Sequence, residues 1–358
     1  MLKDKIALAA NLLEACGLDA FVFLHPPNLR FLCGFTGSDG ALVATRKTDA
    51  FLTDSRYTAQ AQQQVSADDV RQYTAKADGI LEFLRETGAG KVGFESDSLS
   101  YASVERFREK SGNTFEWVPV SRELLSLRGV KTSLEVESLV EAARLNAEAF
   151  EEVLPFIRPG AVERDIALEL EFSLRRRGGE EKAFDFIVAS GERGAMPHGV
   201  ASNRVIRAGE LVTVDFGTRF GGYHSDETVT VAVGDVSPRL REIYDVVLEA
   251  HDRAIAAVKP GVPLREIDDA ARDFIVERGL GDYFGHGTGH GVGLEVHEYP
   301  TVSPRSDETA REGMVFTVEP GVYIPELGGV RIEDMVLVTA AGCRRLTRIP
   351  KDFRTLPV

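Results

Sequence analysis

Residues 209–217 read Gly-Glu-Leu-Val-Thr-Val-Asp-Phe-Gly, and residues 313–321 read Gly-Met-Val-Phe-Thr-Val-Glu-Pro-Gly. Both stretches have glycine at each end and Thr-Val before an acid, which is Asp215 in the first stretch and Glu319 in the second. The apolar and β-branched residues between the glycines predict a short buried strand in each case. The same strand, followed by an acid, is therefore expected twice, which indicates an internal duplication.

The duplication extends to both sides of these strands. Upstream, the matching positions stand 101 residues apart: Pro159-Gly160 with Pro260-Gly261, Ile166 with Ile267, and Gly178 with Gly279. The segments that they delimit have helical spacing. Downstream, the acid pairs that precede a valine-rich strand are Asp226-Glu227 and Glu333-Asp334. Because a repeat of about 100 residues exceeds a solenoid unit, we expect two related halves, each a helix and a β-hairpin, that pack about a pseudo-two-fold axis.

The residues before this duplicated region have a different character. Short buried strands alternate with helices there, which is an α/β pattern. The expected strands are 20–24, 41–44, 50–53 and 91–94, and the expected helices are 55–65 and 100–110. A long amphipathic helix is expected over residues 133–157, ended by Pro159-Gly160. We therefore predict a smaller N-terminal α/β domain, residues 1–128, and a catalytic domain, residues 129–358, in a chain of α+β class.

The composition of the chain indicates which partners and which cellular compartment to expect. The chain has 358 residues, is 43% hydrophobic and 27% charged, and carries a net charge of −14. Neither the acidic balance nor any Lys/Arg run indicates a nucleic-acid binder, and no apolar run approaches the ~18 residues of a membrane span. The N-terminus lacks a signal-peptide pattern. We expect a cytoplasmic protein with neither a nucleic-acid nor a membrane partner, and we interpret its three scattered cysteines as small buried hydrophobes: Cys16, Cys33 and Cys343.

Two acids of the first half are predicted to lie side by side. The expected hairpin consists of a strand at 211–218, a turn at Gly221-Gly222 and a strand at 223–233. A turn centred there places Asp215 opposite Thr228. Because side chains alternate along a strand, Asp215, Asp226 and Thr228 then share one face. Two ionised carboxylates so close together within apolar strands require a cation between them.

The second half repeats the arrangement, so two hairpins that meet at an axis would pool four carboxylates: Asp215, Asp226, Glu319 and Glu333. The alternative, surface acids near a turn, is weak because these acids interrupt apolar strands. Oxygen donors suit Mn²⁺ or Mg²⁺, and an added histidine favours Mn²⁺, Fe²⁺, Co²⁺ or Zn²⁺. Four carboxylates can neutralise two divalent ions, which together polarise a carbonyl and generate a hydroxide nucleophile. The pattern predicts a dinuclear metallohydrolase.

Three histidines fall in one glycine-rich stretch, at His286, His290 and His297. The first two have the i,i+4 spacing of a zinc-binding helix, but glycine at every second position from 285 to 293 argues against a helix. A phosphate cradle would need the Lys and Ser/Thr of a P-loop, which are absent. We predict a loop or strand where backbone can approach closely. A fourth histidine, His198, lies in a separate Pro-His-Gly sequence.

At these residues the chain resembles the pita-bread metallopeptidases, which include methionine aminopeptidase, aminopeptidase P and Xaa-Pro dipeptidase (prolidase). The resemblance covers essentially the whole chain, including a creatinase-like N-terminal domain. The metal ligands that it implies are Asp215, Asp226, His290, Glu319 and Glu333. Asp226 and Glu333 would bridge two divalent ions, expected to be Mn²⁺, with Co²⁺ or Zn²⁺ as alternatives. A metal-bridging hydroxide would attack the scissile carbonyl, with Glu319 as its general base.

The resemblance also assigns residues around the metals. His198 and His297 would support the tetrahedral intermediate, and His286 and Arg331 would contact substrate. One departure is Val229, where the family often has arginine. The intact ligands argue against creatinase, which shares the fold but lacks them, and against a non-catalytic pita-bread binding protein.

The N-terminal domain and the motifs around the histidines favour the Xaa-Pro branch over methionine aminopeptidase. The short chain favours prolidase, which cleaves dipeptides. The alternative is aminopeptidase P, which acts on longer peptides. The resemblance further implies Xaa-Pro peptides as partners and a homodimer.

Overall fold

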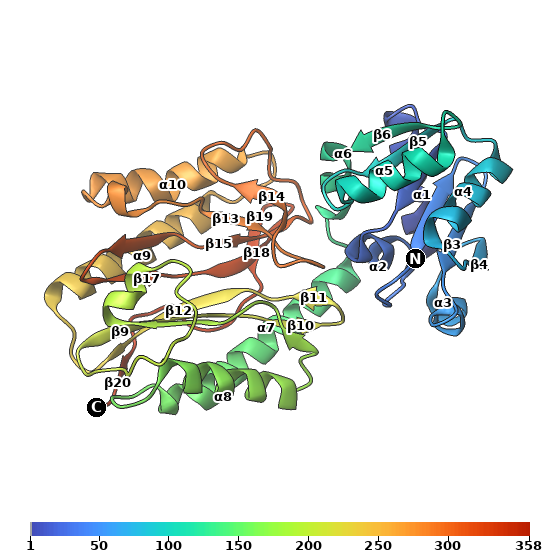
Figure 1. Ribbon diagram of the computed structural model, residues 1–358. Coiled ribbons are helices and arrows are strands. Elements are labelled where there is room, and N and C mark those ends of the chain that lie inside the picture. The colour runs from blue at the N-terminus through green and yellow to red at the C-terminus, as the bar shows by residue number, and fades with distance from the viewer. Residues whose placement is uncertain (1) are drawn as a thin grey trace. The chain divides into compact units, whose positions relative to one another are not determined.

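One six-stranded mixed sheet organises the first unit of the computed structural model, which describes residues 2–358 (Figure 1). The unit comprises residues 1–128, and the remaining residues form a second unit, 129–358. The strands of the first unit, in the order in which they lie, are β4 (Asp69–Gln72), β3 (Asp49–Thr53), β2 (Ala41–Thr45), β1 (Ala20–Phe23), β5 (Lys91–Glu95) and β6 (Glu116–Val120). Strands β1, β5 and β6 run parallel, whereas β1, β2 and β3 form an antiparallel meander. The α/β pattern predicted here is confirmed.

Six helices accompany this sheet: α1 (Leu2–Ala15), α2 (Pro26–Cys33), α3 (Thr58–Gln64), α4 (Lys76–Thr87), α5 (Tyr101–Ser111) and α6 (Arg122–Leu125). Helix α3 is shorter than predicted because the Asp54 carboxylate accepts a 2.8 Å hydrogen bond from the backbone N–H of Arg56, which holds a turn before the helix. Cys33 is buried as expected, but Cys16 and Cys343 are only partly buried, so the expectation holds for one cysteine of three.

The second unit is built on two larger sheets. One has the strand order β20 (Thr355–Leu356), β12 (Glu227–Val233), β9 (Glu210–Phe216) and β8 (Ile187–Ser190). The other has the order β14 (Glu298–Val302), β13 (Gly289–Gly291), β15 (Val315–Val318), β18 (Asp334–Thr339) and β19 (Gly342–Arg345). Two small sheets complete the unit, one of β11 (Tyr223–His224), β10 (Thr218–Phe220) and β7 (Glu181–Lys182), the other of β16 (Gly321–Ile324) and β17 (Gly328–Arg331).

Four long helices enclose these strands: α7 (Ser133–Val153), α8 (Glu163–Arg176), α9 (Pro238–Ala257) and α10 (Leu264–Glu277). Helices α7 and α8 lie on one side and pack a hydrophobic core against β9 and β12, while α9 and α10 lie on the other side and pack a second core against β15 and β18 (Figure 1). A capping box between Thr132 and Glu135 begins α7. The helix ends before the predicted residue 157 because Pro155 lacks an N–H, and a 3₁₀ turn, Leu154–Phe156, follows.

The predicted duplication is confirmed. Helices α8 and α10 each have 14 residues, and both ends are offset by the same 101 positions. In the first half β9 pairs with β12, and Asp215 lies opposite Thr228 as predicted. In the second half β15 pairs with β18. Each strand expected for the first hairpin is divided in two. The first is divided at Gly217 into β9 and β10, and a Cβ added to Gly217 would lie 1.8 Å from the Ser225 carbonyl oxygen. The second is divided into β11 and β12.

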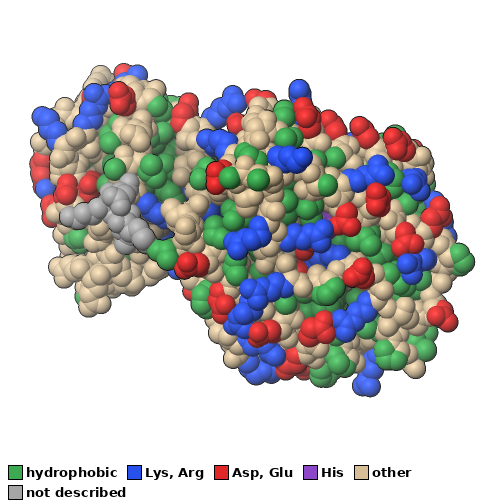
Figure 2. Space-filling view, turned by 180° about the vertical axis from the view of Figure 1, so that it is seen from behind, with side chains coloured by type: hydrophobic (Ala, Val, Ile, Leu, Met, Phe, Trp, Pro, Cys, Tyr) green, Lys and Arg blue, Asp and Glu red, His purple; other side chains and the backbone are tan. Residues whose placement is uncertain are grey.

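The two halves are joined directly by hydrogen bonds. The Glu333 N–H donates to the Thr228 carbonyl (3.2 Å), and the Thr230 hydroxyl donates to the Arg331 carbonyl (2.9 Å). On the surface, acidic and basic side chains are interspersed over the face shown in Figure 2. Within residues 2–358 no helix combines the length and the apolar character needed to cross a membrane.

Candidate metal centre

The five residues predicted as metal ligands line one pocket of the second unit, with a volume of about 750 Å³. Asp215 is at the end of β9 and Asp226 directly precedes β12, so both come from the first hairpin. Glu319 directly follows β15 and Glu333 directly precedes β18, so both come from the second hairpin. His290 lies in the middle of β13. Each half therefore contributes two carboxylates, and the second half adds the imidazole.

Two of the acids accept hydrogen bonds from side chains, one from an arginine and one from a threonine. Nη2 of Arg331 donates a 2.5 Å hydrogen bond to Oδ2 of Asp215. The Thr228 hydroxyl donates a 2.6 Å hydrogen bond to Oε2 of Glu333, so a residue of the first half orients an acid of the second. The other oxygens of these two carboxylates, Asp215 Oδ1 and Glu333 Oε1, are buried without a hydrogen-bond partner among the described residues.

His290 presents a lone pair to the acids. Its Nδ1 lies 3.1 Å from the Gly291 carbonyl, and because a carbonyl oxygen can only accept, Nδ1 carries the hydrogen in this contact. In the neutral ring Nε2 is then an acceptor. Nε2 lies 3.2 Å from Oε1 of Glu319 and 3.7 Å from Oδ2 of Asp226. Three acceptors that face one another need a proton or a metal cation between them.

Burial and the neighbouring charges change the pKa values of the four acids. The pKa of Asp226 lies well above its ordinary value because the carboxylate is buried and Glu333 carries the same charge nearby. The pKa of Glu333 is raised in the same way by burial and by the charge of Glu319. Burial also raises the pKa of Asp215, although Arg331 opposes the shift. In the absence of metal, burial of Glu319 is outweighed by the hydrogen bond from a protonated His290 ring and by the positive charge of that ring, so the pKa of Glu319 is lowered. Asp215, Asp226 and Glu333 are therefore held in surroundings that disfavour their ionised forms, and a cation among them would reverse this effect.

These observations fit a binding site for divalent metal ions. One ligand atom each from Asp226, His290 and Glu333 lie within 4.8 Å of one another. The partnerless oxygens of Asp215 and Glu333 offer further ligands, and the lone pair of His290 faces the same space. Carboxylate oxygens with one imidazole suit Mn²⁺, Co²⁺ or Zn²⁺.

Two further histidines predicted for the site also line the pocket. The ring of His297 lies 4.3 Å, centroid to centroid, from that of His290. Burial lowers the pKa of His297, and the charges of His290 and His198 lower it further, which favours the neutral ring. His198 is exposed and lies between the 3₁₀ turn Gly191–Ala195 and β9. The structure thus brings His198 and His297 beside the acids.

The remaining predicted residues, His286 and Arg331, are linked through Tyr323. Nδ1 of His286 lies 2.8 Å from the Gly287 carbonyl and donates to it, so Nε2 accepts the 2.9 Å hydrogen bond from the Tyr323 hydroxyl. Nη1 of Arg331 donates to the same hydroxyl at 3.0 Å. A continuous chain of hydrogen bonds therefore runs from His286 to Asp215. Tyr323 was not anticipated, since only its place after Gly321 on a strand marks it in the sequence.

The glycine-rich stretch forms β13 and its flanking loops, as expected, but its glycines serve the fold more than the pocket. A Cβ on Gly289 would lie 1.9 Å from the Thr317 carbonyl oxygen, and one on Gly291 would lie 2.2 Å from that of Tyr299. The backbone that approaches closely is therefore the chain's own. Gly285, in contrast, has no atom within 4 Å of an added Cβ and lines the pocket.

A buried acid on α10 fixes the loop that carries His286. Asp268 accepts hydrogen bonds from the Thr288 N–H (2.9 Å) and hydroxyl (2.8 Å). Arg272, one turn further along the helix, donates to Asp268 and also to the carbonyls of Phe284 (3.0 Å) and His286 (2.6 Å). Sequence reasoning did not find this pair, because nothing in the helical pattern indicates which loop it contacts.

The pocket also has an apolar wall. Its apolar and aromatic lining residues outside the acid cluster include Phe184, Ile187, Val200 and Tyr283. Ligand pockets typically combine such a surface with a few placed polar groups. The pocket can therefore hold both metal ions and an apolar group of a ligand.

Several known proteins are similar to this chain over nearly its whole length. The Xaa-Pro dipeptidase of Pyrococcus furiosus is 38% identical over 98% of this chain and 100% of its own length. The structure of the Xaa-Pro dipeptidase from Bacillus anthracis is similar with a TM-score of 0.97 and 43% identity, covering 99% of this chain and 100% of that one. The X-Pro aminopeptidase from Thermotoga maritima has a TM-score of 0.88 and 36% identity, covering 95% and 98%.

Two family descriptions match the chain. Residues 5–130 match the Creatinase/Prolidase N-terminal domain. Residues 137–340 match metallopeptidase family M24 and include every acid and histidine of the pocket described above. The similarity thus spans both units and the whole candidate site. The chain belongs to metallopeptidase family M24 and has the pita-bread fold expected from its sequence, preceded by a creatinase/prolidase N-terminal domain.

Proposed function

We propose that this protein is a prolidase, a metal-dependent peptidase that cleaves the Xaa-Pro bond of dipeptides. The observation that carries the proposal is the cluster of four acids and His290 in one pocket, with two buried carboxylate oxygens left without a donor. Relatives with full-length coverage that bear the name Xaa-Pro dipeptidase support the choice of substrate.

We assign two divalent metal ions, Mn²⁺ by preference, to five ligands: Asp215, Asp226, His290, Glu319 and Glu333. Asp226 and Glu333 come from different halves and carry the most strongly raised pKa values, which suits acids that share two cations. When bound, the metals polarise the scissile carbonyl and activate a water molecule as the nucleophile.

The chain's own residues handle the proton and the developing charge. Glu319 would be ionised as a metal ligand, and we assign it to accept the proton of the attacking water. His297 and His198 line the same pocket as the acids and can donate hydrogen bonds to the carbonyl oxygen as it gains charge. His286 and Arg331, joined through Tyr323, orient the peptide beside them.

Proline specificity follows from the missing amide hydrogen. An Xaa-Pro bond has no N–H, and the ring fixes the local backbone. A pocket that selects it must recognise the ring by shape, and the wall that contains Phe184, Ile187 and Val200 offers an apolar surface for that purpose. Recognition should depend strongly on the ring and weakly on the residue before it.

A cleavage assay tests this function. Leu-Pro and Ala-Pro should be hydrolysed with Mn²⁺ much faster than Leu-Leu and Met-Ala, and exhaustive chelation should abolish activity. Equal rates on the peptides without proline would refute the Xaa-Pro assignment. Elemental analysis of the Mn²⁺-reconstituted protein should give about two metals per chain.

Aminopeptidase P is the alternative, supported by the similarity to the X-Pro aminopeptidase of Thermotoga maritima. A dipeptidase must recognise the C-terminal carboxylate of its substrate, whereas an aminopeptidase P must leave that end open. Comparison of Ala-Pro with Ala-Pro-Ala distinguishes the two. Faster cleavage of the tripeptide would assign the protein to the aminopeptidase class and leave the metal centre unchanged.

A further inference from the structure

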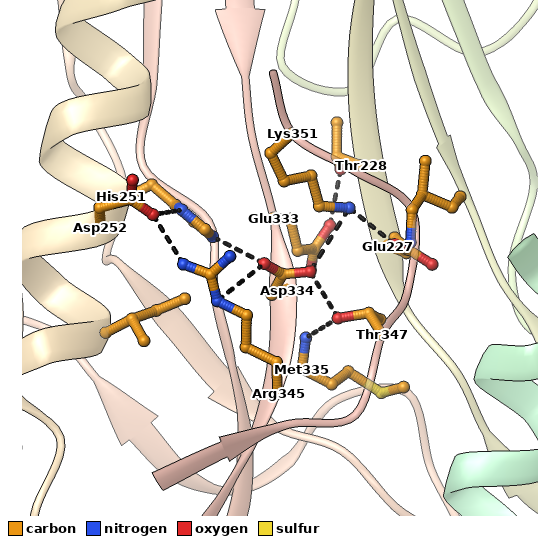
Figure 3. Close-up of polar contacts among 12 residues, drawn as sticks. Glu227, Thr228, His251, Asp252, Glu333, Asp334, Met335, Arg345, Thr347 and Lys351 are labelled. Atoms are coloured by element: carbon orange, nitrogen blue, oxygen red, sulfur yellow. Dashed lines mark hydrogen bonds and ion pairs between the residues drawn. The ribbon is translucent and has the colours of Figure 1, made fainter. Parts of the chain in front are cut away.

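A second group of charged side chains includes Glu227 and Asp334, which directly follow two of the assigned metal ligands in the sequence (Figure 3). Glu227 directly follows Asp226, and Asp334 directly follows Glu333. Because side chains alternate along a strand, a residue next to one that points into the pocket points away from it. Glu227 and Asp334 are 107 residues apart, as are the two acids that precede them. The duplication therefore gives each half one carboxylate on this rear face.

A single lysine contacts both carboxylates. Nζ of Lys351 lies 2.7 Å from Oε1 of Glu227 and 3.5 Å from Oδ1 of Asp334. All three side chains are at most 3% exposed. We call Glu227, Asp334 and Lys351 the rear cluster. Among residues 2–358, Lys351 is the cation whose ion pairs join these two acids, and so join the two halves (Figure 3).

The segment that carries Lys351 is itself fixed to both halves. The Ile349 N–H donates to Oε1 of Glu227 at 3.2 Å. The Thr347 hydroxyl donates to Oδ1 of Asp334 at 2.6 Å. The Tyr244 hydroxyl of α9 donates to the Lys351 carbonyl at 2.8 Å. The lysine thus has little freedom to leave the rear cluster, and its ammonium holds a defined position between β12 and β18.

This position bears on the metal ligands. Asp226 and Glu333 can share cations only if β12 and the start of β18 stay at a fixed separation. On the pocket side that separation is held by the hydrogen bonds between Thr228 and Glu333. On the rear side two buried carboxylates would repel each other without a cation between them. The ammonium reverses this interaction, because it attracts both acids.

We propose that Lys351 is a positioning residue for the metal centre: by pairing with Glu227 and Asp334 it sets the spacing of Asp226 and Glu333 and thereby the affinity for divalent cations. The proposal rests on the function assigned above. Lys351 does not line the pocket. Its effect should therefore appear in metal binding and leave peptide binding unchanged.

The test is calorimetric titration of metal-free protein with MnCl₂. Lys351→Met, which keeps the aliphatic stem and removes the charge, should weaken Mn²⁺ binding by ~10–100-fold, the range found for residues that orient metal ligands. The Mn²⁺ concentration that gives half-maximal activity should rise in parallel, while KM for Ala-Pro at saturating Mn²⁺ stays unchanged. Lys351→Arg, which restores the cation, should recover most of the affinity.

A matched control and a second variant complete the experiment. Arg345 also contacts Asp334, at 3.6 Å, but its side chain is 45% exposed and it has no contact with Glu227. Arg345→Met should leave Mn²⁺ affinity unchanged. If Lys351→Met does not fold, Lys351→Gln takes its place, because it also removes the charge but keeps an amide that can donate a hydrogen bond to one of the two carboxylates.

Three results decide between the possibilities. Wild-type Mn²⁺ affinity in Lys351→Met, or in Lys351→Gln where that replaces it, overturns the positioning role. So does an equal loss of affinity in Arg345→Met, because the effect would then be one of general positive charge. If the unmodified protein itself binds no Mn²⁺, the proposed function fails first, and the two failures are thus distinguishable.

Discussion

The hydroxyl of Thr228 donates a hydrogen bond of 2.6 Å to Oε2 of Glu333, and the Glu333 N–H donates in return to the Thr228 carbonyl. Thr228 lies on β12 of the first half and Glu333 immediately before β18 of the second. A residue of one half therefore fixes the orientation of an acid that the other half contributes to the pocket.

Thr228→Val keeps the shape of the side chain and removes its hydroxyl. Glu333 then loses its donor, and Nε of Arg331, which donates to the same hydroxyl at 3.2 Å, loses an acceptor. A buried group left without its partner costs about 1–3 kcal/mol, so Mn²⁺ affinity should fall roughly tenfold. Calorimetric titration measures the change, with Thr228→Ser as the control that retains the hydroxyl. An unchanged affinity in Thr228→Val would show that this bond does not orient Glu333.

Asp226→Asn and Glu333→Gln should each remove most of the bound metal and most of the activity. A neutral amide shares two cations poorly, and the pooled charge is what attracts them. Without metal, however, each variant should be at least as stable as the unmodified protein. Both acids have a pKa raised by burial and by neighbouring carboxylates, so their ionised forms destabilise the folded state.

Elemental analysis and thermal unfolding with EDTA measure both effects. Full metal content with full activity in either variant would show that these acids are only structural. A large loss of thermal stability in the metal-free variants would contradict the repulsion inferred from the raised pKa values.

His198→Ala and His297→Ala should reduce kcat and kcat/KM together. If these rings donate to the carbonyl oxygen as charge develops, the interaction is made mainly in the transition state. A loss on the order of 10²–10³-fold is expected for such donors. Metal content should stay near normal, because neither ring is assigned as a ligand. Loss of metal from His297→Ala would instead place that ring, 4.3 Å from His290, among the ligands.

Tyr323→Phe tests the chain of hydrogen bonds from His286 to Asp215. The ring remains, but Arg331 loses an acceptor and Nε2 of His286 loses a donor. At about 1–3 kcal/mol for a group left unpaired, kcat/KM for Ala-Pro should fall ~10–100-fold with metal content unchanged. Wild-type kinetics would mean that the tyrosine hydroxyl has no part in placing either residue.

The ion pair between Arg204 and Glu210, which lies outside the pocket of the metal centre, should weaken at acidic pH. Burial alone would raise the pKa of Glu210, but hydrogen bonds from Arg204 and from the Arg207 backbone outweigh it and lower the pKa. A carboxylate whose pKa is lower in the folded state stabilises the fold above its unfolded pKa, and this contribution is lost as the pH falls through the folded pKa.

Glu210→Gln should therefore destabilise the protein at pH 7 and make little difference at pH values below the folded pKa. Urea unfolding of both proteins across this pH range, without metal, measures the difference in their free energies of unfolding. If this difference is the same at all pH values, the ionised carboxylate of Glu210 does not stabilise the fold.

The sequence predicts the parts of the site that depend on local pattern. Strand alternation and the Gly221-Gly222 turn were enough to place Asp215 opposite Thr228. The constant offset of 101 residues anticipated α8 and α10 at both ends. These features follow from periodicity and turn chemistry, which act over a few residues.

Features that depend on distant contacts could not be derived in this way. The offset between matching acids grows from 104 residues at Glu319 to 107 at Glu333, so the second hairpin is longer. That hairpin carries Tyr323, whose role depends on His286, 37 positions away. Lys351 lies beyond both repeated segments, and its carboxylate partners are found only once the two halves pack together.

The distribution of the acids, two from each half, has a thermodynamic consequence. Asp215 and Glu333 are brought together only by the folded chain, so a cation that needs acids of both halves binds the native state and not the unfolded one. By mass action such a ligand stabilises the fold by about 2.7 kcal/mol at a concentration 100 times its Kd. Metal supply would then govern the survival of the protein as well as its rate, and a cell short of metal would lose enzyme to unfolding and proteolysis.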